Sequence, residues 1–413
     1  MNRHTLTAPL LACAISLAAR GGAAADWPQI LGPQRDGHAV GESLQPWDEP
    51  PQLLWRVDCG AGYAGVAVAD DRVLLWHRVG ESELLDCLAV DDGSRLWRAE
   101  FPAVYRGGVD PDRGPRAVPL VADDRVFAYG AAGDLHAVAL ADGETLWSRQ
   151  LGTDYQAADG YFGAGSTPLI AGDLLVVALG GRQGAGIVAV NAADGKTRWQ
   201  ATDEQASYAS PVTIQLDNAP LVAVVMSLNT VVLDPSNGQL VRRFAFGRRG
   251  PVVNAATPLV DGPRLLVTAS YGIGCRMVDL ASDPPSDLWG SREVISSQYA
   301  TPVRIGQWLY GISGREDMQD AGLRCIGWHD GQLAWRQDDY GTAHLIAVGQ
   351  NLLAQKTEGR LELLAADPQQ YRRLASSKLP PGSYRSLPAL SDGVVYCRRS
   401  ISATEGELLA LRP

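Results

Sequence analysis

The chain of 413 residues has no long apolar run beyond residue 25, and its only lysines are Lys196, Lys356 and Lys378. Its formal net charge is −10. Nucleic acid and anionic lipid both require a basic protein surface, so this charge argues against either as a partner. A membrane-spanning helix needs about 20 consecutive apolar residues, and no segment after residue 25 provides them.

Catalytic and metal-binding patterns are also missing. The histidines are isolated from one another, so none has the paired spacing of a zinc site. No Gly-x-Ser-x-Gly motif and no adjacent pair of cysteines occurs. Asp110, Asp112 and Gly114 have the spacing that begins a calcium loop, but the later ligands do not follow. The sequence therefore predicts neither a metal site nor a catalytic residue.

A repeat is the strongest feature that is present. The letters VADDRV occupy residues 68–73 and return at residues 121–126, and spacings of this order indicate a repeat architecture. Apolar segments that begin at a proline recur at Pro119, Pro168, Pro211, Pro258, Pro302 and Pro388. A glycine turn followed four residues later by a tryptophan recurs at Trp97, Trp147, Trp199 and Trp335.

Each copy has the pattern of four short antiparallel strands, which predicts an all-β fold. Such a sheet cannot bury both faces alone, so copies packed around an axis predict a β-propeller with tryptophans between blades. Eight tryptophan positions occur, with Arg242 and Ala375 replacing the aromatic residue in two of them. The chain ends after a third strand at 408–413, and residues 52–58 form a fourth strand without predecessors. We therefore predict eight four-stranded blades, the last closed by the N-terminal strand.

Beyond residue 25 the chain has five cysteines. Cys87 and Cys325 stand at a repeat position that Ala137 and Ala189 occupy in other copies. A residue that alternates with alanine is most simply a small apolar core side chain, so we interpret these cysteines as core residues rather than as disulfides or ligands.

The Ser/Thr-Pro-Leu strand and the run AVNAADGKTRW at 189–199 resemble the repeat of the pyrroloquinoline-quinone-like (PQQ-like) propellers. The resemblance covers residues 52–413 and implies one propeller domain. Residues 26–51 form a lead-in segment before it, and the part at 26–40 resembles the lead-in of secreted proteins of this family. In size and layout the chain is most similar to BamB-like propellers, which implies a scaffold that docks proteins. Repeat motifs of this kind specify fold far better than activity.

Residues 1–25 have the features of a signal peptide. Arg3 and His4 precede a short apolar stretch, and three alanines end it before Asp26. We expect an exported, periplasmic or extracellular protein. An alternative is that Cys13 is the lipidated residue of a lipoprotein signal.

Dehydrogenases that share this repeat bind PQQ in the central funnel, beside a calcium ion and next to an adjacent cysteine pair. This chain lacks that pair, and its propeller is expected to be much shorter than theirs, so no catalytic residue carries over. We therefore expect no enzyme activity and no cofactor. PQQ in the funnel remains the alternative.

Residues just before the strand prolines should converge on the propeller axis. They include arginine, tyrosine and asparagine side chains that could hold an anionic or planar ligand, or could instead fill the axial hole with mutual hydrogen bonds and water. This predicted axial ring consists of Arg116, Tyr208, Asn254, Tyr299, Tyr384 and Arg385.

The two longest connections between blades, 98–117 and 148–166, suggest a docking face. They carry aromatic residues that we expect to be exposed and to contact a protein or peptide partner: Tyr105, Tyr155, Tyr161 and Phe162. The acidic insertion at 314–323 is interpreted as a solvated loop. The sequence thus favours a non-catalytic scaffold that we expect to be monomeric, with a quinoprotein oxidoreductase or a small-ligand binder as the alternatives.

Overall fold

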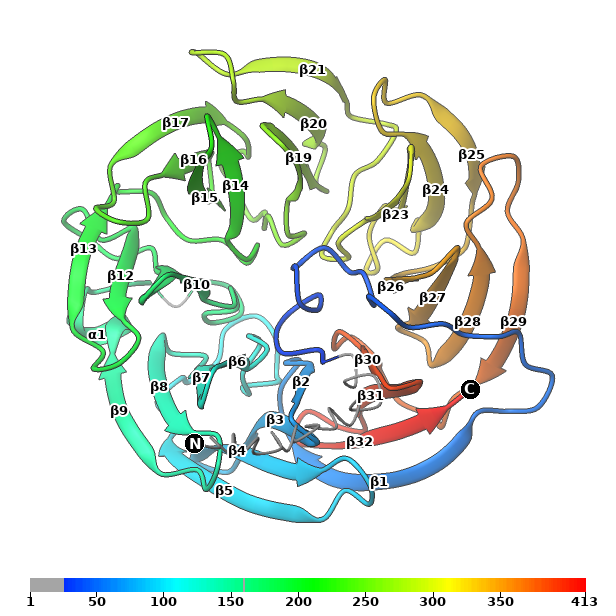
Figure 1. The fold of residues 1–413 in the computed structure, drawn as a ribbon, viewed down its shortest axis with the longest axis horizontal. Helices are drawn as coiled ribbons and strands as arrows, with labels where there is room; N and C mark the ends of the chain where they lie inside the picture. The colour runs from blue at the N-terminus through cyan, green and yellow to red at the C-terminus, as the bar shows by residue number, and fades with distance from the viewer. Residues whose placement is uncertain (1–25, 159) are drawn as a thin grey trace, which may run out of the picture.

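The computed structural model describes residues 26–413 except residue 159, and the predicted signal peptide and Cys13 lie outside these residues. Eight four-stranded antiparallel sheets stand side by side in a ring (Figure 1). The prediction of an eight-bladed β-propeller is confirmed. No helix among the described residues is long and apolar enough to cross a membrane.

The first four blades, numbered in chain order, follow the predicted copies. Blade 1 consists of β2 (Val66–Ala69), β3 (Arg72–Val79), β4 (Ser82–Ala89) and β5 (Arg95–Pro102). Blade 2 consists of β6 (Leu120–Ala122), β7 (Arg125–Tyr129), β8 (Asp134–Ala139) and β9 (Thr145–Gln150), followed by the one-turn helix α1 (Leu151–Asp154). Blade 3 consists of β10 (Leu169–Ala171), β11 (Leu174–Ala178), β12 (Ile187–Asn191) and β13 (Thr197–Ala201). Blade 4 consists of β14 (Val212–Leu216), β15 (Ala219–Val225), β16 (Asn229–Leu233) and β17 (Leu240–Ala245).

The second half of the ring has the same pattern. Blade 5 consists of β18 (Leu259–Asp261), β19 (Arg264–Ala269), β20 (Gly274–Asp279) and β21 (Ser286–Ser291). Blade 6 consists of β22 (Val303–Ile305), β23 (Trp308–Ser313), β24 (Gly322–Gly327) and β25 (Leu333–Gln337). Blade 7 consists of β26 (Ala343–Val348), β27 (Asn351–Lys356), β28 (Arg360–Ala365) and β29 (Arg373–Lys378). Blade 8 consists of β30 (Ala389–Ser391), β31 (Val394–Ser400), β32 (Glu405–Arg412) and the N-terminal strand β1 (Gln52–Gly60).

The ring closes where β1 pairs antiparallel with β32, from Gln52 opposite Arg412 to Gly60 opposite Glu405. The predicted closure of the last blade by the N-terminal strand is confirmed. Because β1 and β32 come from opposite ends of the chain, their pairing removes two sheet edges at once.

The tryptophan of each copy lies between its own blade and the next. The Trp97 indole nitrogen donates a hydrogen bond to the carbonyl of Leu140 in blade 2 at 2.9 Å. The Trp147 indole does the same to Ala192 of blade 3 at 3.0 Å. Equivalent bonds are made by Trp55, Trp199, Trp289 and Trp335. Each indole therefore buries apolar surface between two blades while its N–H group remains hydrogen-bonded.

The two exceptions to the tryptophan pattern have physical explanations. Arg242 donates from Nε to the carbonyl of Leu280 at 3.2 Å, so it makes the same bond to the next blade without a ring. Ala375 faces blade 8. This blade has no turn between its third and fourth strands, because β32 and β1 come from opposite ends of the chain. There the lead-in residue Trp47 reaches back and donates to Ser377 of β29 at 2.8 Å.

The cysteine interpretation is confirmed for Cys87 and Cys325. Both are fully buried, and they pair in register with Trp97 and Trp335. Only a small side chain fits opposite the indole at this position, where Ala137 stands in blade 2. The cysteines of the described part of the chain are buried free thiols.

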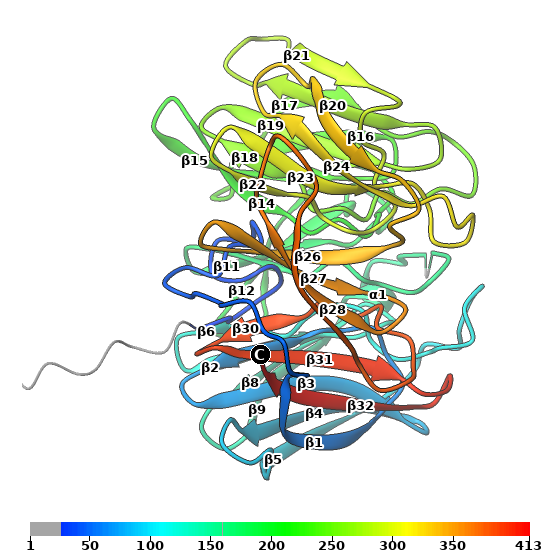
Figure 2. The ribbon, with the colours of Figure 1, turned by 90° about the vertical axis from the view of Figure 1, so that its right-hand side faces the viewer.

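The lead-in segment, residues 26–51, crosses the centre of the ring before it reaches β1 (Figure 1). Trp27 forms an antiparallel bridge with Val68 of blade 1, and His38 forms a parallel bridge with Ala347 of blade 7. Glu42 then accepts backbone N–H groups from the β30–β31 turn. Figure 2 shows the loops of this segment on one face of the ring. The lead-in segment thus ties together blades that are not neighbours.

Arg35 lies at the centre of this crossing and is only 3% exposed. Its guanidinium donates to the carbonyls of Thr167 at 3.2 Å and of Pro211 at 2.9 Å, and also to that of Pro168. Burial lowers the pKa of Arg35 to about 9, so the group is still charged at neutral pH. Carbonyl dipoles from the entrances of blades 3 and 4 therefore stabilise a cation on the axis.

The indole contact makes a prediction about the turn glycines. A Cβ added to Gly143 would lie 2.5 Å from the Trp97 ring, whereas one added to Gly172 would meet nothing within 4 Å. Both glycines have positive φ, of +76° and +63°. Gly172→Ala should therefore cost about 1 kcal/mol from backbone strain alone. Gly143→Ala should cost about 3 kcal/mol, because overpacking adds to that strain. Urea unfolding of the two variants measures the difference, and equal losses would contradict the indole contact.

Candidate functional site

The two faces of the ring differ in what they carry. The hairpin face carries the turns between first and second strands and between third and fourth strands, and the lead-in segment covers its centre. The loop face carries the connections between blades and the turns between second and third strands. The residues of the predicted axial ring belong to these connections, so the candidate site is the centre of the loop face.

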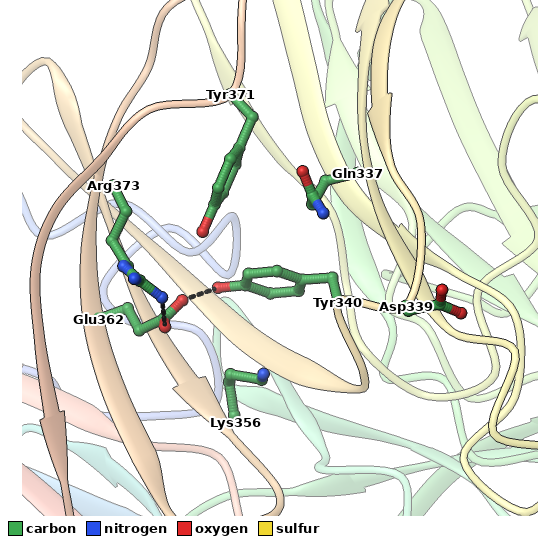
Figure 3. A pocket seen from close by; sticks show the side chains of 7 residues that line it. All are labelled: Gln337, Asp339, Tyr340, Lys356, Glu362, Tyr371 and Arg373. Atoms are coloured by element: carbon green, nitrogen blue, oxygen red, sulfur yellow. Dashed lines mark hydrogen bonds and ion pairs between the residues drawn. The ribbon is translucent and has the colours of Figure 1, made fainter.

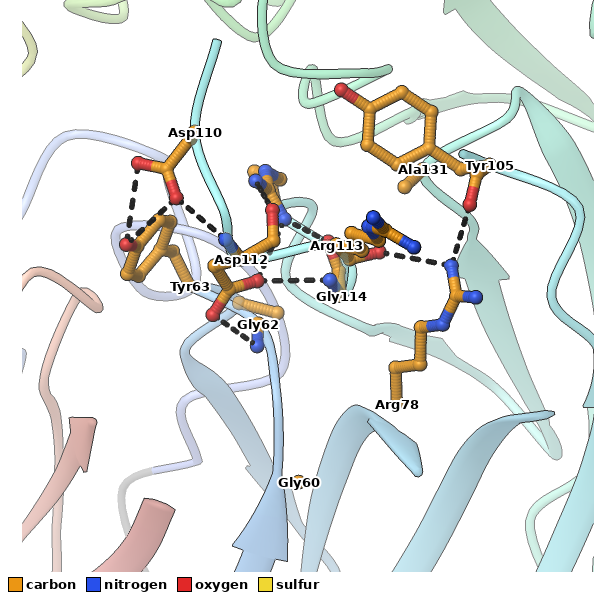
Figure 4. A network of polar contacts seen from close by, with 12 residues as sticks. Gly60, Gly62, Tyr63, Arg78, Tyr105, Asp110, Asp112, Arg113, Gly114 and Ala131 are labelled. Carbon is orange, nitrogen blue, oxygen red and sulfur yellow. Dashed lines mark hydrogen bonds and ion pairs between the residues drawn. The ribbon is translucent and has the colours of Figure 1, made fainter. Parts of the chain in front are cut away.

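A network of polar contacts occupies this centre (Figure 4). Tyr63, from the connection between β1 and β2, lies between two arginines: the guanidinium carbon of Arg116 is 5.2 Å from its ring centroid and that of Arg385 is 5.7 Å. Its hydroxyl donates to Asp110 at 3.3 Å. Arg385 Nη1 lies 3.6 Å from the Asp110 carboxylate. Blades 8, 1 and 2 are therefore joined through one tyrosine and its charged neighbours.

Asp112 organises the loop from which Arg116 extends. Its carboxylate accepts the backbone N–H groups of Gly62 and Gly114, both at 2.8 Å, and pairs with Arg116 at 3.0 Å. The Asp112 side chain is 2% exposed and that of Arg116 is 9% exposed. The Asp110-x-Asp112-x-Gly114 spacing thus shapes a loop around an arginine. No group of three or more His, Cys, Asp or Glu residues that could hold a metal occurs in the described part of the chain.

Glu316 completes the network from the opposite side of the ring. It lies in the 314–323 insertion of blade 6 and pairs with Arg385 Nε at 2.8 Å. It also accepts the Tyr299 hydroxyl at 2.9 Å. The interpretation of this insertion as a solvated loop is wrong at Glu316, because the ring geometry brings its carboxylate to an arginine from the blade 7–8 connection.

The structure thus brings together Arg116, Tyr299 and Arg385 of the predicted axial ring. The other three members have different surroundings. Tyr208 accepts the N–H groups of Tyr161 and Phe162, at 3.1 and 2.9 Å.

Asn254 is 1% exposed and donates to the carbonyl of Met226 at 2.8 Å. Tyr384 is fully buried and donates to the carbonyl of Pro380 at 2.9 Å. These two side chains hold connections in place.

The aromatic residues of the two long connections are not equally accessible. Tyr161 is 39% exposed, and Phe162 lies beside it with a centroid distance of 6.5 Å. Tyr155 is half-buried and its hydroxyl bonds that of Thr197 at 2.7 Å. The expectation that Tyr105 is exposed is wrong. It is 2% exposed, because it packs inward beneath the connection that carries it.

Three residues of the centre escaped sequence reasoning: Tyr63, Asp110 as an ion-pair partner, and Glu316. Tyr63 starts the sequence Tyr-Ala-Gly, which parallels Tyr-Ala-Ser at Tyr208 and Tyr-Ala-Thr at Tyr299. Counting back from prolines missed it, because this copy has no proline. That local triplet was the signal that could have found it.

Two buried acids lie under the loop face beside this centre. Glu83 is 3% exposed and accepts the N–H of Ala131 at 3.2 Å, and burial raises its pKa to about 7. Burial also raises the pKa of Asp134 to about 6. The folded state therefore favours the protonated form of both groups.

A polar cavity of about 370 Å³ lies between blades 6 and 7 (Figure 3). Its Glu362 carboxylate accepts the Tyr340 hydroxyl at 2.8 Å and pairs with Arg373 at 3.2 Å. Lys356 Nζ lies 4.8 Å from the Tyr340 ring centroid. These groups satisfy one another, so the cluster has the character of a contact between blades.

Fold and repeat together define a PQQ-like β-propeller. The family model described as outer membrane protein assembly factor BamB matches residues 82–337. The chain belongs to this family, which confirms the resemblance seen in its repeats. No curated protein sequence matches the chain.

Solved structures with the same fold include a BamB protein and dehydrogenases. BamB from Moraxella catarrhalis overlaps with a TM-score of 0.63 and 16% identity, over 87% of this chain and 99% of that one. The quinohemoprotein alcohol dehydrogenase ADHIIG from Pseudomonas putida HK5 overlaps with a TM-score of 0.67 and 12% identity, over 94% of this chain and 80% of that one. A europium-containing methanol dehydrogenase overlaps with a TM-score of 0.70 and 10% identity, over 94% of this chain and 98% of that one.

The buried Glu83 predicts a pH effect. Its folded-state pKa is raised from 4.5 to about 7, so its contribution to stability is present below about pH 4.5 and is lost as the pH rises through 7. Glu83→Gln cannot ionise and keeps an oxygen for the Ala131 N–H. We expect the variant to gain about 1 to 3 kcal/mol over wild type at pH 8, and much less at pH 5. Urea unfolding at both pH values measures this.

Glu81→Gln is the control, because Glu81 is exposed and should give no such difference between the two pH values. An offset for Glu83→Gln that is the same at pH 5 and pH 8 would contradict the assignment.

Proposed function

We propose that this protein is an exported, non-catalytic scaffold that docks a protein partner on its loop face. The observation that carries the proposal is the pairing of charges on the axis. Arg116 and Arg385 are bound to Asp112, Asp110 and Glu316 across several blades. From the hairpin face, Arg35 fills the axis and is bound by carbonyls. A funnel arranged this way favours rigidity over the binding of a reactant.

The axial side chains fit a quinone cofactor poorly. An anionic planar quinone needs cationic groups that are free to pair with it, and the two arginines of the loop-face centre already have carboxylate partners. The buried cysteines of the described residues belong to blades 1, 5, 6 and 8, and no two of them are adjacent in the sequence. We therefore propose that the protein works without PQQ.

The loop face has the side chains of a docking surface. Apolar residues stand exposed on its connections and on the 314–323 insertion, with Val109 at 73%, Met318 at 62% and Tyr161 at 39% exposure. Val109 and Tyr161 come from the two long connections, which bond to each other through the Val109 N–H and the Tyr161 carbonyl at 3.1 Å. Exposed aromatic and apolar groups surrounded by arginines are typical of protein interfaces.

The proposal extends to location and assembly. Family membership and the pattern of residues 1–25 support export to the periplasm or the cell exterior, with lipidation at Cys13 as the alternative. We propose a monomer that meets its partner through one face.

Docking predicts a selective loss of partners. Tyr155→Ala combined with Tyr161→Ala should remove the proteins that co-purify with wild type after crosslinking in the cell envelope, because it truncates the aromatic residues of this face. The pair Asp124→Ala and Asp142→Ala on the hairpin face is the control and should retain them. Melting temperatures should confirm that all variants fold. Retention of the same partners by the loop-face variant would overturn the docking proposal.

The quinone alternative is tested by titration of residues 26–413 with pyrroloquinoline quinone, with and without calcium. A ligand of the folded state raises stability by about 2.7 kcal/mol at a hundredfold excess over its dissociation constant. We expect no change in melting temperature or in quinone absorbance at millimolar ligand. A shift that disappears with Arg116→Ala plus Arg385→Ala would replace the scaffold proposal with an axial quinone site.

A further inference from the structure

A cavity of about 470 Å³ opens on the loop face over blades 2, 3 and 4, beside the axial network. Its volume falls in the range of small-molecule sites. Its walls come from loop-face turns and connections of all three blades and are rich in small residues, including Gly163, Gly180 and Gly181. Because these residues lack large side chains, the cavity is shaped by backbone and by a few longer polar groups.

One polar group on its wall is buried without a partner. Tyr129 is 1% exposed, and its hydroxyl makes no hydrogen bond with any described residue. A Cβ added to Gly133, another wall residue, would lie 3.5 Å from that hydroxyl oxygen. A buried hydroxyl without a partner is costly, and a ligand in the cavity can supply the missing bond.

The remaining polar lining is almost entirely uncharged. Gln156, Gln183 and Gln205 line the cavity, and none of their side-chain amides bonds another described residue. Each amide can both donate and accept. The charged wall residues are Arg182 and Asp203, of opposite sign, and the Asp203 carboxylate already accepts the Gly184 N–H at 2.7 Å. This lining suits a neutral ligand that is rich in groups that both donate and accept.

Two tyrosines add flat surfaces to this lining. Tyr161 is 39% exposed at the cavity. Tyr208 uses its oxygen to accept two backbone N–H groups, which leaves its hydroxyl proton for an acceptor in the cavity. An aromatic face can cover the C–H side of a sugar ring while the amides bind its hydroxyls.

We propose that this cavity binds a neutral saccharide of one or two rings, with Tyr129, Tyr161 and the three glutamines as its contacts. Hydroxyl groups match bifunctional amide and phenol partners, whereas an anionic or cationic ligand finds no net charge. A peptide bound by strand addition fits less well, because backbone N–H groups of the wall such as those of Gly181 and Arg182 are already bonded within the protein. The site goes beyond the docking function and does not depend on it.

Calorimetric titration of residues 26–413 with glucose, N-acetylglucosamine, maltose and cellobiose tests the proposal. We expect at least one to bind. Tyr129→Phe removes only the hydroxyl that lacks a partner, so it should fold normally and weaken that binding about tenfold, the effect of one hydrogen bond. Tyr161→Ala should weaken it by a similar factor. Tyr310→Phe, an equally buried tyrosine in blade 6, is the matched control and should leave it unchanged.

If none of the sugars binds at a concentration of about 10 mM, which would detect dissociation constants in the millimolar range, the proposal is overturned. Binding that survives both Tyr129→Phe and Tyr161→Ala would place the sugar elsewhere and would also overturn it. Partner capture is read separately, so loss of the docking function leaves this result unaffected. Binding of an unstructured neutral peptide that both substitutions weaken, without binding of any sugar, would assign the cavity to a peptide instead and would overturn the proposal.

Discussion

The contact between neighbouring blades is the interaction on which the ring depends. A single four-stranded sheet has two apolar faces and buries neither of them alone. Here the outer strand of one blade places an indole against the turn of the next, and the indole N–H donates to a carbonyl there. Arg242 keeps the donor and the acceptor position without the ring, and only Ala375 lacks both. The donor to the next blade's carbonyl is therefore more constant than the aromatic surface around it.

Eight blades around an axis leave a central space, and this chain fills it from both faces. The lead-in segment brings Arg35 from the hairpin face, where three carbonyls stabilise a buried cation. On the loop face, Tyr63 lies between two arginines whose carboxylate partners come from blades on opposite sides of the ring. Buried charges are tolerated only when they are paired and hydrogen-bonded. The same groups that hold the ring together thus take up the cationic side chains that an axial anion would need.

How far the sequence predicts this structure follows from the range of the interactions. The repeat is local, so the blades, the terminal closure and the core positions of Cys87 and Cys325 followed from spacing alone. The axial network is not local, because Asp110, Glu316 and Arg385 meet only after the ring closes. An acidic insertion has the composition of a solvated loop whether or not one carboxylate faces an arginine. Likewise, the connection that carries Tyr105 and Val109 does not show in its letters which of the two side chains packs inward.

The fold is shared by an assembly-factor family and by dehydrogenases, so function rests on what the connections place at the loop face. The charged side chains on the axis of a propeller can bind a reactant only if other contacts hold the blades in their ring. In this chain the arginines of the loop-face centre link blades 1, 2, 6 and 8, and removing one would leave a carboxylate such as Asp112 buried without its partner. Stability and axial chemistry therefore compete for the same side chains. Binding can develop without that competition on the part of the loop face away from the axis. Val109 and Tyr161 are exposed there, and the glutamine side chains of the cavity bond no other described residue.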